Sequence, residues 1–147
     1  MQAAQPWPYQ AVSESVQITE NWRRAPEQAG PLDPALRPKD NDMNSWGWFR
    51  AGVPFPAPDR DTEVLCAVEV EAYARVRKSG GVIECLGLLG PATLYIDGQK
   101  VAEKTSEGSA SLSAPFPKGA GKHWVSLIFR ARRGQAFGFT DVVRIRT

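Results

Sequence analysis

The chain has 147 residues, of which 42% are hydrophobic, and its formal net charge is +2. This length suits one domain with a sizeable core, and the near balance of charges implies no strongly acidic or basic partner. No apolar run approaches the roughly 20 residues of a membrane-spanning helix, so no membrane partner is expected. Residues 1–8 are predicted to be a linker without signal-peptide character, and residues 9–147 a single domain.

Weak alternation over residues 9–22 indicates a first strand, which includes Val16 and Ile18. The stretch 25–42 contains four prolines and is predicted to be a long surface connection, because proline is excluded from central strands. Residues 44–58 contain three further prolines, Pro54, Pro56 and Pro58, which interrupt regular secondary structure. The 12 prolines and 13 glycines of the whole chain favour short strands over long helices.

Residues 62–78 place apolar side chains at every second position, which predicts a half-buried strand with a bend or break inside it. Glu69 and Glu71 fall on its polar face. The more continuously apolar segment 81–89 is predicted to be a strand buried on both faces. No segment has a helical period, so no helix is predicted.

Asp97-Gly98 lies between two alternating segments and is typical of a two-residue hairpin turn, which requires positive φ angles. Further strands are predicted at 111–113, 123–132 and 140–146, with turns at 115–121 and 134–138. Short strands separated by regular turn signals predict an all-β fold, either a β-sandwich or a barrel.

Several segments resemble, in order, the motifs of the sugar-binding domain of glycoside hydrolase family 2, the β-galactosidase and β-glucuronidase family. The clearest are Asp42-Met43-Asn44-Ser45-Trp46, Tyr73-Ala74-Arg75 and the hairpin Ala92-Thr93-Leu94-Tyr95-Ile96-Asp97-Gly98. The resemblance covers about 11–147 and implies an antiparallel β-sandwich of the galactose-binding-like jelly-roll type. Family members carry this non-catalytic domain beside a TIM barrel, which needs about 250 residues and does not fit here.

The resemblance therefore implies an accessory domain that supports the catalytic domain of the same parent chain, with galactoside binding as a further role. The parent is expected to be a β-galactosidase, and the domain a C-terminal module that is not itself an enzyme. A periplasmic or extracellular location is favoured for the parent. Two alternatives stay open: a stand-alone carbohydrate-binding module, and a nucleic-acid-binding β-barrel. Against the latter, 16 acidic residues nearly balance 18 basic ones, so no nucleic-acid partner is expected.

Trp46 and Trp48 are the candidate ligand-binding residues, because aromatic rings stack on the apolar faces of sugars. Two positions apart in an extended segment, they are predicted to share a face. Arg50, Asp42 and Asn44 lie close in sequence and supply groups that bind hydroxyls. The alternative interpretation is that both tryptophans pack against the core.

No catalytic residue is predicted. Glu69 and Glu71 are about 7 Å apart on a strand, whereas a retaining glycosidase needs about 5 Å between its carboxyl groups. The single histidine, His123, is predicted to have a structural role in a turn. Cys66 and Cys85 are predicted to be buried thiols, with a disulfide as the alternative. No cofactor or metal site is predicted. Some similar folds hold a structural calcium ion, but no calcium loop is recognisable here.

Overall fold

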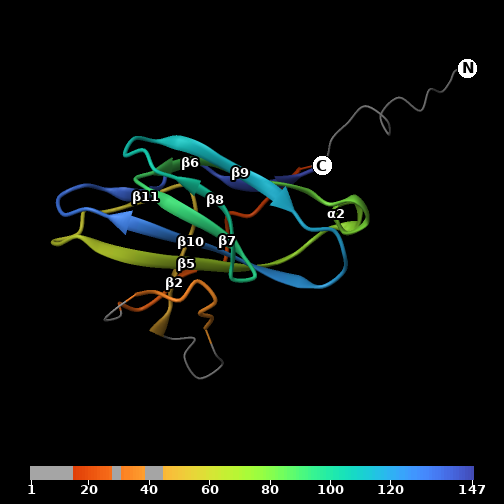
Figure 1. Ribbon diagram of the computed structural model, residues 1–147, viewed down its shortest axis with the longest axis horizontal. Helices are drawn as coiled ribbons and strands as arrows, with labels where there is room; N and C mark the ends of the chain where they lie inside the picture. The colour runs from red at the N-terminus through yellow and green to blue at the C-terminus, as the bar shows by residue number, and fades with distance from the viewer. Residues whose placement is uncertain (1–14, 28–30, 39–44) are drawn as a thin grey trace, which may run out of the picture.

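Two antiparallel sheets pack face to face across an apolar core in the computed structural model, which describes residues 15–27, 31–38 and 45–147 (Figure 1). The first, here called the β5 sheet, runs in the order β3 (Gly47–Phe49), β2 (Trp22–Arg24), β5 (Thr62–Glu71), β10 (Lys122–Ala131), β7 (Ala92–Ile96) and β8 (Gln99–Lys104). The second, the β6 sheet, runs in the order β1 (Ser15–Gln17), β12 (Val143–Arg146), β6 (Gly81–Leu89), β11 (Phe137–Phe139) and β4 (Pro54–Phe55), with β9 (Ala110–Phe116) also paired to β6. The predicted antiparallel β-sandwich is confirmed.

The core lies between the sheets and consists of side chains from alternate residues of the strands. In β5 the inward residues are Val64, Cys66, Val68 and Val70, all buried. One edge of the core is aromatic, with neighbouring ring centroids 4.9 to 6.2 Å apart. This cluster contains Trp22, Phe49, Phe55, Phe129, Phe137 and Phe139. The short strands at this edge are thus stabilised by packing of aromatic side chains rather than by many hydrogen bonds between strands.

The Asp97-Gly98 turn is confirmed. Asp97 has φ 52° and Gly98 has φ 82°, and Ile96 pairs directly with Gln99 across the hairpin. Positive φ at both central residues is the signature of a type I′ turn, whose twist matches that of the flanking strands.

The prediction that no helix forms is wrong for Ala74–Ser79, which is the short helix α2 rather than the end of a strand. The amide of Arg77 donates to the Tyr73 carbonyl at 3.0 Å, and Gly80 ends the helix with φ 78°. One buried residue, Val76, anchors the helix to the core. In the part of the chain that the structure describes, no helix has the length and apolar character needed to cross a bilayer.

Three strand predictions need correction. β6 is not buried on both faces, since Ile83 and Cys85 are buried while Glu84 and Leu86 are half-buried. β9 extends to Phe116 and includes Pro115, which a strand paired on one side tolerates. Phe137 and Gly138, the last two residues of the turn predicted at 134–138, belong to β11. In each case the partner strand, which is distant in sequence, determines the extent of the element.

Glu84 joins β6 to β12 through two arginines. Its Oε1 accepts hydrogen bonds from Arg144 Nε at 2.8 Å and from Arg146 Nε at 3.0 Å. The hydrogen bond from Arg144 is the largest influence on the Glu84 pKa, which lies below its ordinary value of 4.5 despite the opposing effect of burial. The stability that this carboxylate contributes is therefore present above pH 4.5 and is lost as pH falls through the lowered pKa.

Glu84→Gln is accordingly expected to lower the free energy of unfolding at pH 7 by about 1 kcal/mol, because it removes the charge between two arginines. The difference from the unmodified chain should shrink at pH 3, because below pH 4.5 the unfolded chain takes up a proton on this carboxyl group more readily than the folded chain does. Urea denaturation at the two pH values measures both. A difference that stays constant between them would show that the ion pairs contribute nothing to stability.

Candidate functional site

Trp46 and Trp48 both belong to the outer side of the β5 sheet, which faces away from the β6 sheet. Trp48 pairs with Arg23, and Arg23 with Ala67, so the three residues share one face. Trp46 packs in the same buried cluster as Ala67. Their exposures differ, however: Trp46 is 4% exposed and Trp48 is 61% exposed. Of the two rings, Trp48 is therefore the one available to a ligand.

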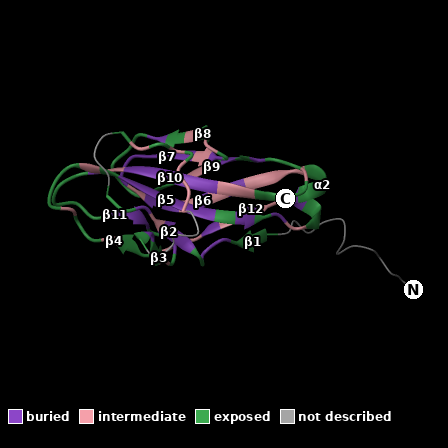
Figure 2. Ribbon diagram, turned by 90° about the horizontal axis from the view of Figure 1, so that it is seen from below, coloured by how far each residue is buried: buried purple, intermediate pink, exposed green. Residues whose placement is uncertain are grey.

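Trp46 is held in a second apolar layer outside the sandwich. The described parts of the predicted connection, residues 25–27 and 31–38, lie against this face of the β5 sheet (Figure 1). The buried members of the layer are Ala25, Trp46, Leu65, Ala67 and Ile128, with Leu32, Leu36, Tyr95 and Trp124 packed against them. As a result β5 and β10 are buried along much of their length (Figure 2). The predicted surface connection thus serves as part of the fold.

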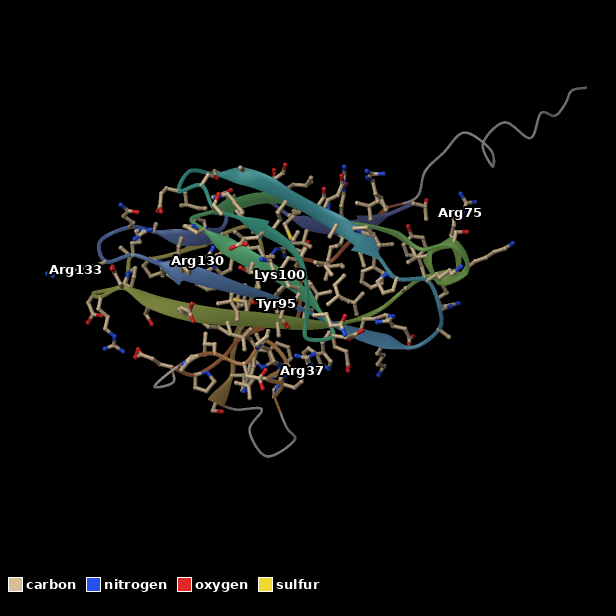
Figure 3. All side chains as sticks on the ribbon, viewed as in Figure 1. Arg37, Arg75, Tyr95, Lys100, Arg130 and Arg133 are labelled. Carbon is tan, nitrogen blue, oxygen red and sulfur yellow. The ribbon has the colours of Figure 1, made fainter. Side chains whose placement is uncertain are left out.

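Arg37 ties the end of this connection to the sheet. Its guanidinium carbon lies 5.3 Å from the centre of the Trp124 ring. Figure 3 shows Arg37 on the side of the sheet where the connection runs. Ala35 also lies close to the hairpin turn. A Cβ atom built on Gly98 would be 3.6 Å from the Cα atom of Ala35. The connection is therefore fixed at the β7–β8 hairpin.

Trp48 is supported from one side by Arg23. The guanidinium carbon of Arg23 lies 3.3 Å from the centre of the Trp48 ring, and Arg23 itself is 4% exposed. Such cation–π stacking fixes the plane of a ring that is otherwise in solvent. No pattern in the sequence marks Arg23, and only its strand pairing with Trp48 identifies it.

Of the remaining predicted site residues, the structure describes only Arg50. Arg50 lies past the end of β3 and pairs with Glu20 at 2.6 Å, with both side chains largely exposed. Asp42 and Asn44 lie outside the described residues, as does the 39–42 end of the connection. The candidate site is thus represented in the described residues by Trp48, its support Arg23 and, separately, Arg50.

Arg50 borders a groove of about 370 Å³ between the β1–β2 connection and the end of β5. Its lining consists of Arg50 and the two ranges Val16–Asn21 and Val68–Glu71. Both Glu69 and Glu71 are exposed here, as predicted for the polar face of this strand. The volume falls within the range of small-molecule sites, but the lining contains no aromatic ring.

A second hollow, of about 490 Å³, lies between the β7–β8 hairpin and the end of β9. At its border, Asp97 accepts hydrogen bonds from His123 Nδ1 at 2.7 Å and from the Trp124 amide at 2.9 Å. Burial raises the pKa of Asp97, but these hydrogen bonds, together with the charges of His123 and Arg37, hold the pKa below its usual value. The His123 ring packs edge-on against Phe116, with 5.3 Å between centroids.

His123 consequently closes one end of the core and fixes the hairpin. It is the second residue of β10 and so lies within the strand predicted at 123–132, whereas the turn in which its structural role was predicted ends before Lys122. Its neighbours are a carboxylate that is already bonded and a core phenylalanine, and among the described residues no serine or cysteine nucleophile is bonded to it. The arrangement is that of a structural histidine.

Cys66 and Cys85 are fully buried free thiols, which confirms the prediction. Burial raises the pKa of Cys85 to about 12 and raises that of Cys66 further. Neither thiol is therefore a nucleophile at neutral pH. Within 15–27, 31–38 and 45–147, no three His, Cys, Asp or Glu side chains gather as they would around a metal ion.

The comparisons with known proteins identify the fold. No protein-family model and no curated protein matches the sequence. Among solved structures, the chain is similar to a Bacteroides uniformis β-glucuronidase, with a TM-score of 0.72 and 13% identity over 92% of this chain and 18% of that one. It is similar to the Faecalibacterium prausnitzii β-glucuronidase, with a TM-score of 0.74 and 10% identity over 100% of this chain and 33% of that one.

A third similar structure is the GH2 β-galacturonidase from Eisenbergiella tayi bound to galacturonate, with a TM-score of 0.59 and 14% identity over 91% of this chain and 24% of that one. At these identities the likeness concerns the fold. The chain spans between 18% and 33% of the lengths of these three proteins. Their names describe glucuronidases and a galacturonidase, so they give the predicted β-galactosidase type no support.

Proposed function

We propose that this chain is a non-catalytic accessory domain of a family 2 glycoside hydrolase. The observation that carries the proposal is the asymmetry of coverage: the sandwich aligns over 92–100% of this chain, yet over 18–33% of the two β-glucuronidases. A jelly-roll domain that supports a separate catalytic domain of the same parent chain accounts for this asymmetry. The ordered sequence motifs independently favour the same family.

The chemistry of the described residues supports a non-catalytic role. His123 is held by Asp97 at 2.7 Å, and both cysteines are buried. Glu69 and Glu71 follow each other at two-residue spacing on one strand, which separates them by about 7 Å. The names of the similar structures favour a β-linked hexuronide as the substrate of the parent. A β-galactosidase is the alternative type for the parent. We propose no cofactor for this domain.

An activity assay tests the non-catalytic assignment. The isolated chain is incubated with the p-nitrophenyl β-glucuronide, β-galacturonide and β-galactoside, and nitrophenol release is followed. Release is expected to equal that of buffer alone. Hydrolysis that saturates with substrate and is lost in Glu69→Gln or Glu71→Gln would contradict the proposal, because it would place a catalytic carboxylate in this chain.

A second candidate function, carbohydrate binding by this domain itself, is favoured by one observation. The Trp48 ring is 61% exposed and is held in place by Arg23, as a stacking platform for a sugar should be. The third hypothesis, a nucleic-acid-binding barrel, has less support, because the strands form two facing sheets instead of one closed sheet.

Tryptophan fluorescence tests sugar binding. The chain is titrated with galactose, lactose, glucuronate, and galactan and xylan oligosaccharides. If the domain binds sugar, a saturable shift is expected with the intact chain and none with Trp48→Ala. Silence of a folded chain across the panel would leave domain support as its role. A shift that persists in Trp48→Ala would place the binding site elsewhere.

A further inference from the structure

β5 changes along its length from a central strand to an edge strand. On one side, β10 pairs with β5 over its entire length. On the other side, β2 pairs with Cys66 and Ala67, and the amide of Ala25 donates to the Leu65 carbonyl at 2.9 Å. Asn21 then adopts a left-handed conformation with φ 67° just before β2 begins. Among the described residues, no strand covers residues 68–71 on this side.

The free backbone groups of this edge can be assigned from the register. Because Ala25 bonds to Leu65 across the ladder, the odd-numbered residues of β5 direct their backbone N–H and C=O groups away from β10. Those of Glu69 and Glu71 therefore point into the open side, while Val68 and Val70 bond toward β10. Within the described chain, Glu69 and Glu71 have no backbone partner on the open side.

The groove beside this edge is bordered by apolar core residues and by three carboxylates, of which two are paired with basic side chains. Ile18, Val68 and Val70 are core residues that border it. On the rim, Arg50 pairs with Glu20 at 2.6 Å, and Lys122 Nζ lies 3.9 Å from Glu69. Among the described residues, the Glu71 carboxylate has no ion-pair partner. The site thus combines backbone N–H and C=O groups that have no partner among the described residues, an apolar groove and the negative charge of Glu71.

We propose that this edge, residues 68–71 of β5, binds an extended, lysine- or arginine-bearing segment of another polypeptide as an added strand. Main-chain bonds to Glu69 and Glu71 would supply the pairing, one apolar side chain would enter the groove, and a basic side chain would meet Glu71. The inference goes beyond the proposed function and does not depend on it.

Two other occupants fit less well. A sugar would find no aromatic ring in the lining of this groove. A second copy of the chain could pair through the same edge about a two-fold axis. The Glu69 and Glu71 side chains of one copy would then lie opposite those of the other copy. Like charges directly opposite each other across strands are destabilising.

Nuclear magnetic resonance of the ¹⁵N-labelled chain tests the proposal. The probes are a short synthetic peptide that alternates valine with lysine, and its counterpart with glutamate in place of lysine. In the free protein the amide hydrogens of Glu69 and Glu71 should exchange rapidly with solvent. The lysine peptide should shift their signals saturably and protect them from exchange, whereas the glutamate peptide should do neither.

Four outcomes would overturn the proposal: no shift with the lysine peptide, equal shifts with both peptides, shifts of the same amides by galactose or lactose, or protection of these amides before any peptide is added. The last would mean that the edge is already covered. Sedimentation of the free chain identifies whether a second copy is the cover.

A backbone substitution separates strand addition from simple charge attraction. Glu69→Pro removes an N–H group that bonds to no described residue, and proline is tolerated where a strand edge is open. We expect this variant to stay folded and to lose peptide binding. Glu69→Gln, the matched control, keeps the N–H group and should weaken binding about two- to fivefold at low salt. If Glu69→Pro fails to fold, Glu71→Pro at the strand end tests the same bond. A folded proline variant with unchanged affinity would contradict strand addition.

Discussion

Replacing Trp46 with alanine is expected to lower the free energy of unfolding by about 3–5 kcal/mol, the cost of removing a large buried aromatic side chain. Trp46 is 4% exposed, and it packs with Leu65, Ala67 and Ile128 on the outer side of the β5 sheet. Its loss would leave a cavity next to the residues packed against this layer, which include Leu32 and Leu36. Urea denaturation followed by circular dichroism measures the change, and a loss of this size is a large fraction of the stability of an ordinary domain.

Trp48→Ala is the matched control, since it removes the same side chain two residues further along. The Trp48 ring is exposed and stacks on Arg23, so removing it is expected to cost less than about 1 kcal/mol. Equal costs for the two variants would show that the outer layer does not hold Trp46 as described. The contrast also determines which tryptophan is suitable for binding studies, because a ligand titration with an unfolded variant has no meaning.

The architecture was predictable because its strongest signals are local. Alternation of apolar residues over 62–78 and the Asp97-Gly98 turn each need only a few neighbouring residues. The turn formed as predicted, and the alternating segment formed β5 over Thr62–Glu71 with a break after it. The half-buried character predicted for this strand is wrong, because β5 is buried on both faces from Val64 to Val68. The family motifs then placed these elements in a sandwich. A helical period becomes visible only when several buried residues recur along a segment. The helix α2 is too short for this, because it buries one residue, Val76.

The candidate site was less predictable because contacts between distant segments determine it. In the sequence, Trp46 and Trp48 look alike, yet one is buried and the other is exposed. This difference depends on Leu32 and Leu36, which lie in a proline-rich connection and pack against the cluster that contains Trp46. Arg23 supports Trp48 through a strand pairing that no local pattern signals. Likewise, the open edge at Glu69 and Glu71 arises where Asn21 turns the chain away from β5.

Trp22→Ala is expected to be at least as damaging as the loss of Trp46, because Trp22 belongs to the core between the sheets. Its ring is fully buried, 5.0 Å from that of Phe139 and 6.2 Å from that of Phe49. Its Nε1 also donates to the Ile18 carbonyl at 2.9 Å. A cavity together with an unpaired buried carbonyl should cost about 3–5 kcal/mol or more, measured by urea denaturation.

Trp22→Phe divides this cost into its two parts. Phenylalanine keeps a ring against Phe139 and fills much of the volume, but it leaves the Ile18 carbonyl without its donor. The expected cost is therefore about 1–3 kcal/mol, the penalty of an unsatisfied buried polar group with a small packing defect. Ile18 connects β1 to β2 and itself donates to the Val143 carbonyl at 2.7 Å, so the bond from Trp22 links the two sheets at one edge. A phenylalanine variant as stable as the unmodified chain would show that packing alone holds this edge, and that the indole hydrogen bond contributes nothing to joining the sheets.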